Sequence, residues 1–97
     1  MSQESAGLFS LKDKVIVVTG GTGVLGGSFV KAINRQGGIV VIIGLDGKVG
    51  DQRAAELESN GGAPALSIVA NVLEESQLII ARDKIMATYG RIDGLVN

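Results

Sequence analysis

The chain has 97 residues, enough for one small domain, and 45% of them are hydrophobic; with one Tyr, two Phe and no Trp, any core must be built from aliphatic side chains. The absence of Cys and His excludes a disulfide framework, a thiolate metal site and a nucleophile activated by His. A net charge of −1 without a long run of one sign argues against nucleic-acid or membrane-surface partners, and the polar N-terminus and short apolar runs favour a cytoplasmic protein.

The pattern of apolar residues predicts alternating strands and helices. Residues 1–9 lack periodicity and are expected to form a flexible tail, while residues 10–97 form one domain. Strands are expected over residues 15–19, 39–43, 65–70 and 92–96, helices over residues 25–36, 51–60 and 74–89, and a loop over residues 44–50. Gly37, Gly61 and Gly90 end the helices. This order predicts an α/β fold with a Rossmann-like, doubly wound parallel sheet, of which the sequence holds the N-terminal β-α-β-α-β-α-β portion.

Apolar stripes on the expected helices should face this sheet. The stripes are expected to comprise Leu25, Phe29 and Ile33 with Val30 beside them; Ala54, Ala55 and Leu57; and Leu78, Ala81, Ile85 and Tyr89, flanked by Ile79 and Met86. The strand over residues 39–43 is apolar on both faces and should be buried on both.

A glycine cluster separates the first strand from the first helix. Residues Gly21 to Gly26 fit G-x-G-x-x-G in the strand-to-helix context that this motif requires. Such glycines allow a tight turn, let a pyrophosphate approach the backbone and let the helix pack closely on the strand. The positive helix end would then face the phosphates, and the alternative is a glycine turn without a ligand. The phosphate loop of nucleotide triphosphatases is disfavoured, because Gly27 stands where that loop needs a lysine.

Four features resemble the N-terminal part of the short-chain dehydrogenase/reductase family over residues 10–97. They are the strand and Thr-Gly over residues 14–20, the glycine turn, Asn71-Val72 in place of the family's usual Asp-Val, and residues 89–97, which resemble the approach to the family's Asn-Asn-Ala-Gly. The resemblance implies an NAD(P)-binding domain, hydride transfer to or from a carbonyl or alcohol substrate, and a homo-oligomer. Val24 departs from the family's glycine, and the variant turn is similar to the branch containing D-mannonate (fructuronate) oxidoreductases, so a sugar acid is a candidate substrate.

On this resemblance, the cofactor lies along the glycine turn and the ends of the later strands. The expected contacts are Gly20, Gly21, Thr22, Val24, Leu25 and Gly26 around the phosphates, Asp46 near the ribose, Asn71 and Val72 near the adenine, and Asn97 beside the nicotinamide. Asn71 replaces an aspartate of the family, and its amide can still donate and accept hydrogen bonds. No metal site is expected.

The end of the second strand carries no plain selector between NAD and NADP. A carboxylate there bonds the ribose 2′-OH, and a nearby Arg accommodates a 2′-phosphate, but Gly44 and Leu45 occupy these places in the family register. Asp46 either reaches the ribose or is a turn residue, and Lys48 either neutralises a 2′-phosphate or is only solvated. The cofactor is therefore NAD or NADP, with NAD slightly favoured.

The family's catalytic Ser and Tyr-x-x-x-Lys are not found in the sequence. Tyr89, the only tyrosine, is followed four residues later by Asp93, so Tyr89 is expected to be a core residue. We therefore expect the cofactor-binding part of an oxidoreductase without its catalytic half. Two alternatives stay open: a nucleotide-binding module without catalysis, and an inactive fragment that associates through an unpaired strand edge.

Overall fold

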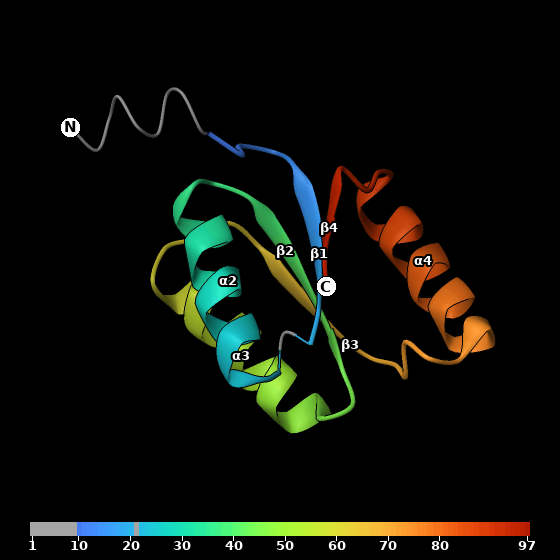
Figure 1. Cartoon of the computed structure of the whole chain (residues 1–97). Coiled ribbons are helices and arrows are strands. Elements are labelled where there is room, and N and C mark those ends of the chain that lie inside the picture. The colour runs from blue at the N-terminus through green and yellow to red at the C-terminus, as the bar shows by residue number, and fades with distance from the viewer. Residues whose placement is uncertain (1–9, 21) are drawn as a thin grey trace.

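The computed structural model describes residues 10–20 and 22–97, so the tail expected over residues 1–9 and the phosphate contact expected of Gly21 lie outside the described residues (Figure 1). Within this part, strands and helices alternate as predicted. The elements are β1 (Val15–Thr19), α2 (Val24–Arg35), β2 (Ile39–Gly44), α3 (Gly47–Ser59), β3 (Ala65–Val69), α4 (Glu75–Tyr89) and β4 (Gly94–Val96). The α/β fold class is confirmed.

The four strands form one parallel sheet in the order β3-β2-β1-β4. Val17 at the middle of β1 pairs with Val41 of β2 on one side and with Leu95 of β4 on the other. Because all the strands run the same way, their carboxyl ends meet at one edge of the sheet, which is where ligands bind in open α/β folds. The loops after β1, β2, β3 and β4 therefore converge on a common edge.

Helices cover the sheet on both faces, α2 and α3 on one and α4 on the other (Figure 1). Each face has its own apolar core because successive side chains of a strand point to opposite sides. The core beneath α2 and α3 contains Ile16, Val18, Val30, Ile33, Val40, Ile42, Ala54 and Leu57. The core beneath α4 contains Val15, Val17, Val41, Ile43, Ile68, Ala70, Ala81 and Ile85. The predicted burial of β2 on both faces is confirmed.

Several expected helix contacts are wrong. Leu25 and Phe29 are 75% and 47% exposed, because α2 turns Gly26, Val30 and Ile33 toward the sheet. Ala55 is exposed as well, since α3 buries Gly50, Ala54 and Leu57. The stripe expected on α4 faces the sheet, since Leu78, Ala81 and Ile85 line the cleft between α4 and the sheet. Only Ala81 and Ile85 are buried there, and Leu78, like the flanking Ile79 and Met86, is partly exposed.

Helix α3 begins at Gly47, four residues earlier than expected, and replaces much of the predicted loop. The side chain of Asp46 accepts a hydrogen bond from the N–H of Val49 at 3.1 Å and so caps the helix. Gly50 packs against Ser67 of β3 so closely that an added Cβ would collide with the Ser67 hydroxyl. The capping bond and this close packing outweigh the low helix propensity of Gly47 and Gly50.

Candidate dinucleotide site at the carboxyl edge of the sheet

The glycine turn after β1 leaves the start of α2 open to solvent. Gly20 has a left-handed backbone (φ +72°), and its carbonyl accepts a hydrogen bond from the N–H of Gly23 at 2.9 Å. Gly23 is the N-cap of α2, and no side chain of the described residues caps it. Val24 and Leu25 are 87% and 75% exposed. Since the first N–H groups of a helix have no partner within the helix, this end is suited to bind an anion.

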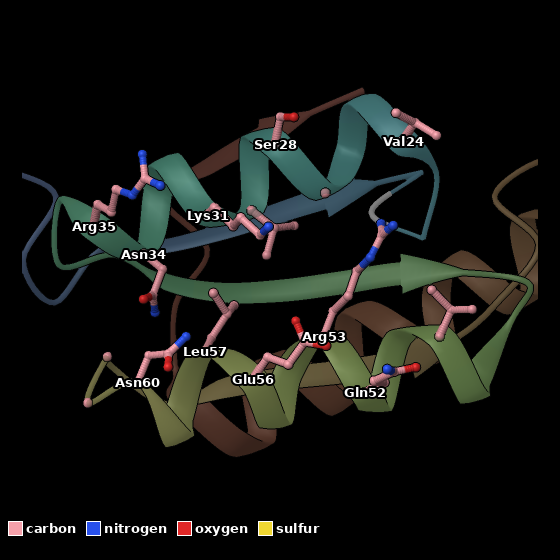
Figure 2. Close-up of a pocket in the computed structure, with 15 residues that line it drawn as sticks. Val24, Ser28, Lys31, Asn34, Arg35, Gln52, Arg53, Glu56, Leu57 and Asn60 are labelled. Carbon is pink, nitrogen blue, oxygen red and sulfur yellow. The ribbon is translucent and has the colours of Figure 1, made fainter.

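An arginine that the sequence did not indicate reaches the same turn. The Nη1 group of Arg53, on α3, donates a hydrogen bond to the Gly23 carbonyl at 2.6 Å. Figure 2 shows this side chain extending from α3 toward the start of α2 near Val24. A Cβ at Gly27 would lie 3.0 Å from the Arg53 Cζ atom, so glycine at this position leaves room for the guanidinium. Arg53 thereby ties α3 to the glycine turn and brings a positive charge to it.

A groove of about 870 Å³ lies between α2 and α3 (Figure 2). Arg53 and Val24 line one end of it, whereas Asn34 and Asn60 line the other. Of the described residues that are expected to bind the cofactor, the groove includes only Val24. We therefore place the candidate site at the carboxyl edge of the sheet, which the groove touches only at its Val24 end.

At the end of β2, Thr22 lies directly over Gly44. A Cβ built on Gly44 would be 2.5 Å from Thr22 Oγ1 and 2.7 Å from Thr22 Cγ2. Leu45, the next residue, is 71% exposed, and Asp46 caps α3 through its Oδ1 atom. The capping contact agrees with the interpretation of Asp46 as a local structural residue and leaves its expected ribose contact untested.

The loop after β3 is held by local hydrogen bonds of Asn71. Its backbone N–H donates to Gln77 Oε1 at 2.6 Å, and its side-chain Oδ1 accepts from the N–H of Leu73 at 3.0 Å. Val72, the second expected adenine contact, is 37% exposed. Asn71 therefore shapes the turn between β3 and α4, and an aspartate at this place could accept the same bond from Leu73.

Thr19 joins the ends of β1 and β4. Its hydroxyl lies 3.2 Å from the Val96 carbonyl oxygen and 3.1 Å from Asn97 Oδ1, so it donates to one of these acceptors at a time. Thr19 and Asn97 border an apolar cleft of about 310 Å³ between α4 and the sheet, which Val72 also lines. Asn97 and Val72, two of the expected site residues, are thus brought to the same cleft.

The arrangement at this edge of the sheet suits a dinucleotide. The described residues hold no group of three or more His, Cys, Asp or Glu side chains that could bind a metal ion. Tyr89 packs against the core beneath α4, as expected, and burial raises the pKa of its phenol. Glycines remove side chains from the turn, the start of α2 is open, and the expected contact residues that the structure describes follow the carboxyl ends of the strands.

Comparisons with known proteins agree with this geometry. The family model described as short chain dehydrogenase matches residues 14–97. The uncharacterized oxidoreductase UxuB of Bacillus subtilis is 32% identical over 88 residues, which cover 91% of this chain and 31% of UxuB. The 2-(S)-hydroxypropyl-CoM dehydrogenase 3 of Xanthobacter autotrophicus is 37% identical over 87 residues, which cover 90% of this chain and 34% of that protein.

A solved structure shows the same fold. It is a proposed D-mannonate oxidoreductase from Haemophilus influenza with bound NAD, with a TM-score of 0.86 and 28% sequence identity over 94% of this chain. The match covers 32% of that structure, so the chain spans about a third of the length of the relatives it matches. No helix in residues 10–20 and 22–97 is long and apolar enough to cross a membrane.

Proposed function

Because the chain belongs to the short-chain dehydrogenase family, we propose that it is the NAD(P)-binding part of an oxidoreductase that transfers hydride between a nicotinamide cofactor and a carbonyl or alcohol substrate. The observation that carries the proposal is the open start of α2 directly after the glycine turn, at the carboxyl edge of a parallel sheet. The cofactor supplies the hydride chemistry, and the residues of this chain bind and orient it.

The glycine turn holds the pyrophosphate in this proposal. Backbone N–H groups at Val24 and Leu25 donate to phosphate oxygens, while Gly20 and Gly26 allow the turn and the close helix. Gly21 and Thr22 are further proposed phosphate contacts, and the Arg53 hydrogen bond to Gly23 fixes the orientation of the Gly23 carbonyl.

The remaining expected residues contact the rest of the cofactor. In this proposal Asn71 and Val72 contact the adenine, Asp46 contacts the ribose, and Asn97 lies beside the nicotinamide. The bound NAD of the Haemophilus relative supports NAD as the slightly favoured cofactor, and the name of that relative supports a sugar acid as the substrate class.

Calorimetric titration of NAD⁺, NADH, NADP⁺ and NADPH tests the proposal. We expect binding in the wild-type chain and a loss of at least about tenfold in affinity in Gly26→Val, because Gly26 is buried in the first turn of α2 and a branched side chain would displace that turn. Ser28→Val adds a branched side chain on the exposed part of the same helix and should bind like the wild type. A folded chain that binds none of the four nucleotides would contradict the proposal.

A further inference from the structure

The side chain of Thr22 blocks the place where a side chain at position 44 would begin. Two of its heavy atoms, Oγ1 and Cγ2, lie 2.5 Å and 2.7 Å from the Cβ that Gly44 lacks. The Cβ of threonine carries two heavy atoms, which occupy two of the three staggered positions about χ1. Every rotamer therefore places a heavy atom in at least one of the two positions that would collide with a side chain at position 44. Rotation of Thr22 therefore cannot admit a side chain at position 44, and only a backbone shift could.

Small residues lie next to Thr22. A Cβ at Gly50 of α3 would be 3.7 Å from Thr22 Cγ2, an ordinary contact distance, and would collide with the hydroxyl of Ser67. Thr22, Gly44, Gly50 and Ser67 thus form one tightly packed patch between the end of β2 and the first turns of α3. Within this patch the hydroxyl of Thr22 lies over Gly44, at the end of β2.

That place matters because the end of β2 is where a Rossmann domain selects between NAD and NADP, through a carboxylate that bonds the ribose 2′-OH or an Arg that accepts a 2′-phosphate. We propose that in this chain the Thr22 hydroxyl, and not a carboxylate, meets the 2′ position of the adenosine ribose, so that the site takes both NAD and NADP. The inference rests on the proposed function and deepens it, because it names the group that recognises the adenosine end.

The charges around the patch agree with acceptance of both cofactors. No carboxylate stands at Gly44 to repel a 2′-phosphate, and Asp46 directs its Oδ1 atom to the N–H of Val49. Leu45 offers no guanidinium to a 2′-phosphate, and the Nη1 group of Arg53 is directed to the Gly23 carbonyl. A hydroxyl donates to a phosphate oxygen and also accepts from a 2′-OH, so it serves either substituent.

The test uses two nucleotides that differ only at the 2′ position, 5′-AMP and adenosine 2′,5′-bisphosphate, titrated into the 97-residue chain by NMR with circular dichroism to check the fold. In the wild type we expect dissociation constants within about tenfold of each other. Thr22→Val keeps the shape and removes the hydroxyl, so both nucleotides should bind about two- to tenfold more weakly, which is the range expected for one lost hydrogen bond.

Introducing an aspartate at position 44 tests the roles of Thr22 and Gly44 separately. Gly44→Asp alone should weaken both nucleotides, since the new side chain displaces Thr22 and the glycine turn. In the double variant Thr22→Ser/Gly44→Asp, the Cβ of serine carries a single heavy atom, which can take the one staggered position that does not collide with a side chain at position 44. We expect this double variant to recover 5′-AMP binding and to prefer 5′-AMP over the bisphosphate by at least about tenfold.

Three results would overturn the inference: a wild-type preference for one nucleotide beyond about tenfold, unchanged binding in Thr22→Val, or full 5′-AMP affinity in Gly44→Asp alone. The first two do not depend on the folding of the Gly44 variants. If the wild-type chain binds neither these nucleotides nor NAD(P), the proposed function itself fails, whereas binding of NAD(P) with one of the three results removes only the role of Thr22.

Discussion

The two faces of the sheet are covered to very different degrees, although the strands supply apolar residues to both. Beneath α2 and α3, Val40 and Ile42 are fully buried, and the helices contribute Val30, Ile33 and Leu57 from 1% to 9% exposed. On the other face α4 contributes only Ala81 and Ile85 as buried residues, while Leu78 and Leu95, which line the cleft there, are 38% and 61% exposed. The face that carries the glycine turn is therefore the better packed one.

This difference indicates which part of the candidate site is held rigidly. The start of α2 and the end of β2 lie on or beside the closely packed face, where Arg53 and Thr22 add contacts between elements. The cleft bordered by Thr19 and Asn97 lies on the less covered face. The exposed apolar residues there are suited to contact another polypeptide.

The largest expected effect compares one leucine from each face. Leu57→Ala should lower the free energy of unfolding by about 2–5 kcal/mol, because Leu57 is 7% exposed and its removal leaves a cavity. Leu78→Ala should cost about 1 kcal/mol or less, since Leu78 is 38% exposed and already borders a cleft. Urea unfolding of both variants measures the difference. Equal costs would show that the two faces are packed alike in solution.

A smaller effect compares the starts of α3 and α4. Asp46→Ala should cost about 1 kcal/mol, because it removes the bond to the N–H of Val49, and Asp46→Asn should retain most of the stability. Glu74 is the N-cap of α4 and makes no side-chain cap bond, so Glu74→Ala should change stability by about 0.5 kcal/mol or less. Stability is measured by urea unfolding without nucleotide. An Asp46→Ala variant as stable as the wild type would remove the capping role.

Much of the fold could be predicted because the local signals agree with the tertiary structure. Apolar runs marked the strands, and Gly37, Gly61 and Gly90, all with positive φ, ended the helices as expected. The errors were of two kinds. The stripe through Leu25 and Phe29 was wrong by one position, since periodicity alone does not fix which side of a short helix meets the sheet. The early start of α3 depended on packing of Gly50 against Ser67, distant in sequence.

The site was only partly predictable for the same reason. The glycine turn is a local motif, so its position could be found from sequence spacing. Arg53 could not, because its bond to Gly23 joins residues 30 positions apart, and the doubled Gly26-Gly27 was the one local hint. The contact of Thr22 with Gly44 likewise joins two segments distant in sequence, the turn after β1 and the end of β2, and the sequence showed only that the usual selector was missing.

The smallest expected effect concerns the attachment of β4 to β1, and it depends on pH. The Asp93 carboxylate accepts from Arg91 Nη2 at 2.6 Å and from the N–H of Val15 at 2.8 Å, and these two bonds, in that order, lower the pKa of the Asp93 carboxyl below its usual value of 3.8. A carboxyl with a lowered pKa stabilises the fold above its unfolded pKa, and this contribution is lost as the pH falls through the folded pKa. Asp93→Asn should therefore be less stable than the wild type near neutral pH, and the gap should shrink below about pH 4. Thermal unfolding from pH 7 to pH 3 measures the gap.

Asp83→Asn removes an exposed pair with Arg82 and should show little difference at any pH. A gap for Asp93→Asn that stays constant down to pH 3 would show that β4 is held by its backbone bonds, such as the one from the Asp93 N–H to the Val15 carbonyl at 2.8 Å, and not by this charge.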